Sequence, residues 1–118
     1  MTEQAKKIAE CAAKALDQKK AMDIQIIDVA EMTIVAECFV VASGSNPIQV
    51  RALSQAAEEA IKEQFDLDPI RSDGYNEGRW IVLDYGDVLL HIFHQEERDF
   101  YNLERLWNDG NNTIQFHA

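Results

Sequence analysis

An apolar run that stops at an abrupt turn limits the possible folds of this chain more than any other segment. Residues 38–43 read Cys-Phe-Val-Val-Ala-Ser, without a charged side chain, which is typical of a central strand buried on both faces. The turn Gly44-Ser45-Asn46-Pro47 follows at once. Asn46 is a favoured helix N-cap residue and Pro47 suits the first helical turn. The segment therefore predicts a central strand that passes through a tight turn into a helix.

The other regular patterns extend this to a complete fold. Apolar residues at helical spacing predict helices over residues 2–20, from Pro47 to a point before Asp68-Pro69, and over 96–107. β-Branched and apolar runs predict further strands over residues 24–29, 70–72, 79–84 and 87–94. The order α-β-β-α-β-β-β-α predicts an α/β fold, a single-domain mixed β-sheet with packed helices. We expect the domain to span residues 1–107 and residues 108–118 to be a loose C-terminal tail.

Length and cysteine content agree with one domain in a reducing compartment. The chain has 118 residues and 47% hydrophobic content, enough for one core. No apolar run approaches the ~20 residues that span a bilayer, and residues 1–20 lack the pattern of a signal peptide. Cys11 and Cys38 form neither a disulfide framework nor a zinc site, and we predict that both are buried. We expect a cytoplasmic protein with no membrane segment.

The charge of the chain bears on its partner. A formal net charge of −10 disfavours nucleic-acid binding, which requires a basic footprint to neutralise phosphates. We therefore expect no direct binding of nucleic acid, sequence-specific or not. Opposite fields favour association with a basic partner, although acidity that only maintains solubility is the alternative.

A predicted hairpin around Tyr85-Gly86 sorts its side chains onto two faces. A two-residue turn would place Asp84 opposite Asp87 and Trp80 opposite His91, all on one face. That face also contains Val82 and Leu89. The opposite face is purely aliphatic and should be the core face; it consists of Ile81, Leu83, Val88, Leu90 and Ile92. The mixed face, aromatic and acidic, suits an interface, although carboxylates beside a turn are often only solvated.

The predicted third helix divides in a similar way. Arg98, Tyr101 and Arg105 share one face, which we expect to point outward. Arg and Tyr are residue types that contribute strongly to binding when a partner buries them, and a solvated face is the alternative. The apolar stripe that we expect to pack inward consists of Phe100, Leu103, Leu106 and Trp107.

Signals for catalysis are weak. Gly44-Ser45 lies between a strand and a helix, where a nucleotidyltransferase holds phosphate with backbone N–H groups. Such an enzyme also requires two carboxylates one residue apart on a strand to hold magnesium. Glu58-Glu59 are adjacent on a predicted helix, so only Asp84 and Asp87 remain for that role. We predict a binding protein without catalytic residues, metal or cofactor, with an altered nucleotidyltransferase as the competing hypothesis.

Several blocks of sequence carry a resemblance to a known family. They are Asp23-Ile24, Phe39 to Ser45 with Gln49-Val50, Trp80 to Val88 with His91, and Arg98 to Trp107. These blocks resemble the Iojap family, whose bacterial members are ribosomal silencing factors, and the similarity extends from about Ala9 to Trp107.

The resemblance implies a nucleotidyltransferase-like fold that lacks the catalytic carboxylates. It also implies a function: family members bind ribosomal protein fourteen of the large ribosomal subunit and sterically block joining of the small subunit, which represses translation under nutrient limitation. Organellar relatives assist large-subunit assembly, and a homodimer off the ribosome is possible. The partner contacts that we expect from the resemblance and the face argument are Trp80, Asp84, Tyr85, Asp87, His91, Arg98 and Tyr101.

Three positions depart from the usual family pattern. Glu37-Cys38 stands where Asp-Tyr is usual, and Asp73-Gly74 replaces Glu-Gly. Arg79 replaces a common Glu before the Trp. This last change adds a cation beside the expected contact surface and is predicted to weaken attraction to a basic partner.

Overall fold

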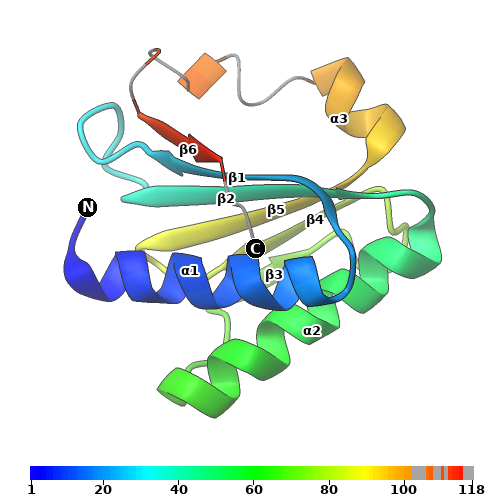
Figure 1. Cartoon of the computed structure of the whole chain (residues 1–118), viewed down its shortest axis with the longest axis horizontal. Coiled ribbons are helices and arrows are strands. Elements are labelled where there is room, and N and C mark those ends of the chain that lie inside the picture. The colour runs from blue at the N-terminus through cyan, green and yellow to red at the C-terminus, as the bar shows by residue number, and fades with distance from the viewer. Residues whose placement is uncertain (102–105, 108–109, 111, 116–118) are drawn as a thin grey trace.

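A computed structural model describes residues 1–101, 106–107, 110 and 112–115 (Figure 1). The elements in chain order are α1 (Glu3–Gln18), β1 (Met22–Asp28), β2 (Cys38–Gly44), α2 (Pro47–Phe65), β3 (Arg71–Asp73), β4 (Trp80–Asp84), β5 (Val88–His94), α3 (Gln95–Tyr101) and β6 (Thr113–Gln115). Up to α3 this is the predicted order, and the α/β fold with one mixed sheet is confirmed. Among the described residues, no helix combines the length and the apolar character that crossing a bilayer requires.

The sheet has the strand order β3-β4-β5-β2-β1-β6. β2 and β5 are parallel, and every other neighbouring pair is antiparallel. A parallel pair needs a crossover connection, which α2, β3 and β4 supply here. All residues of β2 are buried, so the prediction of a central strand at residues 38–43 is confirmed.

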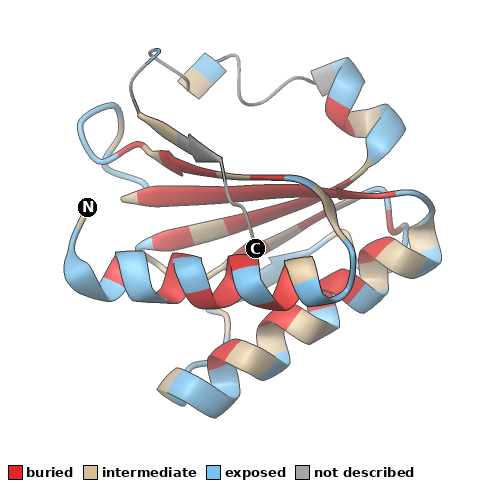
Figure 2. Cartoon of the chain, viewed as in Figure 1, coloured by how far each residue is buried: buried red, intermediate tan, exposed pale blue. Residues whose placement is uncertain are grey.

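Helices α1 and α2 cover one face of the sheet, with their buried sides toward the strands (Figures 1 and 2). α2 begins at its predicted signals, and α1 begins within its predicted range, where Thr2 acts as the N-cap. The Thr2 side chain accepts a hydrogen bond from the Ala5 N–H, and the Asn46 side chain accepts one from the Gln49 N–H at 2.8 Å. Pro47 occupies the first turn of α2. The sequence therefore fixes where each helix starts, and packing against the sheet holds it in place.

The core between these helices and the sheet contains the predicted aliphatic face of the hairpin. Each of its members is fully buried: Ile81, Leu83, Val88, Leu90 and Ile92. Cys11 and Cys38 are free and buried, as predicted. Burial raises the pKa of the Cys38 thiol to about 12, so it stays protonated and unreactive near neutral pH.

The predicted register of the hairpin is wrong by two residues. Asp84 pairs with Leu89, not with Asp87, and Trp80 pairs with Phe93. The Tyr85 N–H donates to the Val88 carbonyl at 2.9 Å, so the turn encloses Gly86 and Asp87, one residue later than predicted. Because the side-chain period of a strand is two, an even shift keeps every residue on its predicted face. Trp80 and His91 therefore still share one face, although the two aspartates are not opposed.

The expectation of a loose tail is wrong for residues 113–115. They form β6, which pairs with β1 through the Ile26–Ile114 register. The Asp28 N–H also donates to the Asn112 carbonyl at 2.9 Å. β1 would otherwise expose a row of unpaired backbone groups at the sheet edge, and the added strand satisfies them. The domain boundary at residue 107 stays a prediction.

Candidate partner-binding surface

The face of the sheet opposite α1 and α2 carries an aromatic cluster. Phe39 of β2 and His91 and Phe93 of β5 are buried, and Trp80 of β4 is half-buried. The Trp80 ring stacks on Phe93 at a centroid distance of 4.7 Å. Phe39 lies edge-on to His91 at 5.0 Å and to Trp107 at 5.3 Å. The cluster therefore forms a second, smaller core on this side of the sheet.

His91 positions the indole of Trp80. The Trp80 Nε1–H donates to His91 Nδ1 at 3.2 Å, so Nε2 carries the proton of the neutral imidazole. His91 is only 7% exposed, and burial lowers its pKa to about 4. It is therefore neutral at physiological pH. The predicted contact residue His91 is therefore buried and holds the Trp80 indole, while its contact with a partner stays a prediction.

Toward β3, the same face of the sheet opens to solvent. We call this the open face and define it by Trp80, Val82, Asp84, Asp87 and Leu89. Asp87 is exposed in the β4–β5 connection and the other four are half-buried. Val82 and Leu89 lie on this face, as strand alternation predicts, although neither was among the expected contact residues. The open face therefore combines an indole and two aliphatic side chains with two carboxylates.

The strand β3 adds charges to the edge of the open face. Arg71 is the register partner of Asp84, and Asp73 is the register partner of Val82. Both are exposed. Three carboxylates and one guanidinium thus lie on or beside the face, which leaves it acidic and favours a basic partner.

Asp84 and Asp87 differ in their structural roles. One Asp84 carboxylate oxygen accepts a hydrogen bond from the Gly86 N–H at 2.7 Å, and Gly86 has a φ of 87° that favours glycine. Asp84 therefore also holds the turn. Asp87 contributes its carbonyl oxygen, which accepts from the N–H groups of Glu37 and Cys38, while its side chain is exposed. A charge change at Asp87 tests binding more cleanly than one at Asp84.

Tyr85 lies on the opposite side, in the main core. Its side chain is 9% exposed and packs within the cluster beneath α1 and α2. Burial, with the Glu58 carboxylate nearby, raises the pKa of the Tyr85 hydroxyl above its ordinary value. The Tyr85 side chain is therefore turned away from the open face, and its expected contact with a partner stays a prediction.

The predicted faces of the third helix are reversed at Arg98. Arg98 is 6% exposed; its Nη1 donates to the Ser43 hydroxyl at 2.9 Å and to the Met22 carbonyl at 3.3 Å. Phe100, expected to pack inward, is 80% exposed. The reason is the direct passage from β5 into α3 at Gln95, which turns Arg98 toward the sheet. Arg98 therefore joins α3 to β1 and β2 through a buried side chain, and its expected contact with a partner stays a prediction.

The rest of the predicted third helix is only partly described. Leu106 is 74% exposed, whereas Trp107 is half-buried against the aromatic cluster. The inward packing predicted for the apolar stripe is thus wrong at Leu106 and correct at Trp107. Residues 102–105, including Leu103 and Arg105, and the side chain of Tyr101 lie outside the described part of the structure.

Arg79, the cation that departs from the family pattern, is paired within the chain. Its Nε donates to the Glu97 carboxylate at 2.7 Å, and its Nη2 lies 3.8 Å from the Glu96 carboxylate. The two acids of α3 offset its charge. The predicted loss of attraction for a basic partner is therefore reduced.

A cavity of about 400 Å³ opens between α3 and the ends of β1 and β2. Its lining is polar and includes Asp23, Gln25, Ser43, Arg98 and Asp99. Asp23 has a left-handed φ of 49° at a register irregularity of β1. Among the described residues, no group of His, Cys, Asp and Glu is arranged to hold a metal ion.

The strand-to-helix turn at Gly44-Ser45 is occupied by intramolecular contacts. The Ser45 backbone N–H and hydroxyl both donate to the Gln49 side chain, at 2.7 Å and 2.9 Å. A Cβ on Gly44 would lie 3.0 Å from Val50 Cγ2, so the glycine allows α2 to pack closely on β2. These contacts account for the sequence of the turn without a bound phosphate.

Comparisons with known proteins agree with this fold. Residues 2–117 match the family described as "Ribosomal silencing factor during starvation". A ribosomal silencing factor from Bacillus subtilis is 40% identical over 108 residues, which cover 89% of this chain and 88% of that protein. The chloroplastic protein Iojap of Zea mays is 32% identical over 98 residues, which cover 83% of this chain and 42% of the plant protein.

Two solved structures have the same architecture. A crystal structure of a protein from Chromobacterium violaceum superposes with a TM-score of 0.85 at 31% identity and covers 97% of this chain and 94% of that chain. A crystal structure of a protein from Bacillus halodurans gives a TM-score of 0.80 at 31% identity and covers 94% of this chain and 99% of that chain. The similarity predicted from the sequence blocks is confirmed over nearly the whole chain.

Proposed function

The chain belongs to the ribosomal silencing factor family, and on that premise we propose that it binds the large ribosomal subunit through ribosomal protein fourteen and sterically blocks joining of the small subunit. It would act in the cytoplasm and repress translation under nutrient limitation. The observation that carries this proposal is the open face, a half-exposed tryptophan fixed by a buried histidine and bordered by carboxylates.

The composition of the open face fits a protein partner. Trp80, Val82 and Leu89 offer apolar area that a partner can bury, and tryptophan is enriched among the residues that dominate binding energies. Asp84 and Asp87 add a negative charge that fits a basic ribosomal protein and repels the phosphates of ribosomal RNA. The face therefore favours contact with a protein component of the subunit.

Occlusion requires no chemistry. A folded domain with principal extents of 34 × 33 × 27 Å that sits on a subunit-joining surface excludes the other subunit by its volume. Affinity and lifetime on the subunit then determine the degree of repression. This agrees with the internal contacts at Gly44-Ser45, which leave the nucleotidyltransferase hypothesis without an evident phosphate site.

The test is cosedimentation with purified large subunits, followed by addition of small subunits. The wild-type protein is expected to travel with free large subunits and to reduce the yield of joined ribosomes. Asp87→Lys should weaken binding by about tenfold or more, since it places a like charge against a basic partner. Asp84→Asn removes a charge but keeps the oxygen that holds the turn, and should weaken binding less.

Glu59→Lys is the matched control, because Glu59 is an exposed carboxylate on α2 and the change in net charge is the same. It should bind as wild type does. Equal binding by Asp87→Lys and wild type would exclude the open face as the interface. If the protein cosediments only with immature large-subunit particles, the proposed silencing function is wrong, and the result indicates a role in subunit assembly.

A further inference from the structure

The loop between β1 and β2 exposes three large apolar side chains together. Ile34 is 104% exposed, Val35 68% and Met32 42%. We call these three residues the loop tip. Figure 2 shows this loop as a predominantly exposed segment at one end of the molecule. Contiguous exposed apolar side chains with a polar rim are typical of an interaction site.

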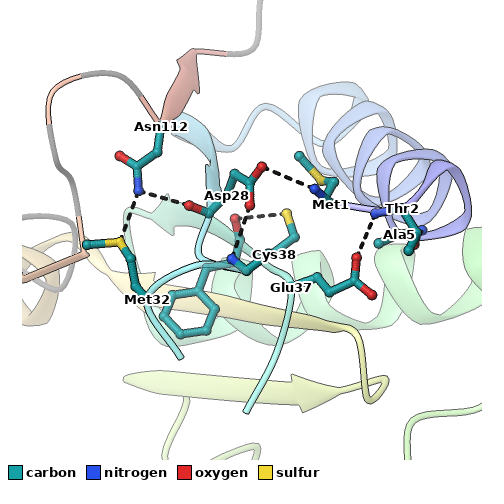
Figure 3. A network of polar contacts seen from close by, with 10 residues as sticks. Met1, Thr2, Ala5, Asp28, Met32, Glu37, Cys38 and Asn112 are labelled. Atoms are coloured by element: carbon teal, nitrogen blue, oxygen red, sulfur yellow. Dashed lines mark hydrogen bonds and ion pairs between the residues drawn. The ribbon is translucent and has the colours of Figure 1, made fainter. Parts of the chain in front are cut away.

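The base of this loop is held by several contacts, which Figure 3 shows. The Met1 ammonium lies 3.3 Å from the Asp28 carboxylate, and the Thr2 N–H donates to Glu37 Oε1 at 2.6 Å. The Asn112 side-chain amide donates to the Asp28 carbonyl at 2.9 Å and approaches Met32 Sδ at 3.4 Å.

Hydrogen bonds within the loop add to this order. The Val29 N–H donates to the Glu37 carbonyl at 2.9 Å, and the Met32 and Thr33 N–H groups donate to the Val29 carbonyl. The Val35 N–H donates to the Thr33 hydroxyl at 3.1 Å. Ile34 and Val35 are thus displayed on a structured turn. Display on an ordered turn lowers the conformational entropy lost on binding.

The surroundings of the loop tip are acidic. Between Lys20 and Arg51 the chain contains no Lys or Arg, whereas Asp28, Glu31 and Glu37 lie in or beside the loop. An acidic rim opposes insertion into an anionic membrane surface and contact with RNA. It fits a basic protein surface that presents an apolar pocket.

The loop tip adjoins the open face. The backbone N–H groups of Glu37 and Cys38, at the end of the loop, donate to the Asp87 carbonyl at 2.8 Å and 3.1 Å. Asp87 is itself an exposed member of the open face. One partner can therefore contact both surfaces at this end of the sheet.

We propose that the loop tip is a second docking element for the same basic large-subunit protein, which receives Ile34 and Val35 in an apolar pocket. This inference rests on the proposed function and extends it, because it names a contact that the aromatic and acidic open face does not include. The open face contributes negative charge and the Trp80 indole to binding. The loop tip contributes apolar side chains that the partner buries.

The test compares the double variant Ile34→Ser/Val35→Ser with wild type in equilibrium binding to purified large subunits. Both side chains are exposed, so the fold is expected to survive, and urea unfolding checks that its midpoint is unchanged. The double variant should bind about tenfold more weakly or worse. Ile48→Ser is the control, because Ile48 is 76% exposed at the start of α2, and it should bind as wild type does.

The outcomes separate the two proposals. If wild type does not bind large subunits, the proposed function is wrong, and so is the loop-tip docking element that rests on it. If wild type binds and the folded double variant binds equally well, only the loop-tip inference is overturned. It is also overturned if sedimentation equilibrium shows that the double variant loses self-association while its affinity for large subunits is unchanged, since a second copy would then be the occupant.

Discussion

Acidification should destabilise this protein through His91, well above the pH at which carboxylates protonate. In the unfolded chain the imidazole has its ordinary pKa of 6.5, whereas burial lowers the pKa in the folded state to about 4. Between these values the unfolded state binds more protons than the folded state, so stability falls as pH falls. The contribution is fully present above pH 6.5 and is lost on the way to pH 4.

The magnitude follows from the difference between the two pKa values. At 1.36 kcal/mol per pH unit, the gap between 6.5 and about 4 corresponds to a total loss of about 3 kcal/mol, of which about 2 kcal/mol is lost by pH 5. For a domain of this size, whose free energy of unfolding is about 5–15 kcal/mol, that is a measurable fraction. The desolvated environment causes the effect, because Phe39 and Phe93 surround the ring.

The assay is urea unfolding at pH 7.5 and pH 5.0 for wild type and His91→Phe. The variant keeps an aromatic ring in the cluster but cannot take up a proton. It also loses the hydrogen bond from Trp80, a cost that does not depend on pH. Carboxylates and the other histidines contribute equally to both proteins. Wild type should therefore lose about 2 kcal/mol more than the variant between these pH values. Equal losses would show that His91 is protonated readily in the folded state.

Two further predictions concern stability. Leu90→Ala should lower the free energy of unfolding by about 2–5 kcal/mol, because Leu90 is fully buried; a cost below about 1 kcal/mol in urea unfolding would contradict its place in the core. Arg98→Met should cost about 1–3 kcal/mol, because the Ser43 hydroxyl and the Met22 carbonyl lose a buried donor. The Arg98→Met variant should bind large subunits as wild type does. Weaker binding by a variant of unchanged stability would indicate that Arg98 contacts the partner.

The sequence was sufficient to predict features that depend on local pattern. Strand alternation identified the core face of the hairpin, and it did so even though the register was wrong by two residues, since both registers have the same parity. Asn46 and Pro47 identified the start of α2 because capping is a local interaction. These signals depend only on residues a few positions apart.

The features that were mispredicted depend on contacts between distant segments. Arg98 turns inward toward Ser43 and Met22, which are 55 and 76 residues away in the sequence. Spacing within the helix cannot reveal such partners. Likewise, Thr113–Gln115 is too short to be recognised as a strand, and it becomes one because β1 offers an unpaired edge. In both cases the rest of the fold decides the local structure.

Resemblance to the family alone does not separate residues that contact a partner from residues that position them. Tyr85 and His91 lie in the same family block as Trp80 and Asp87, and Arg98 begins the last family block, yet all three are buried. His91 nevertheless holds Trp80 at the surface through the Nε1–Nδ1 hydrogen bond. A side chain fixed in this way loses less conformational entropy when a partner covers it, by up to about 1 kcal/mol for one side chain. Replacement of a buried residue in these blocks can therefore weaken binding without removing any contact, and only variants at exposed positions such as Asp87 and Ile34 test the interface directly.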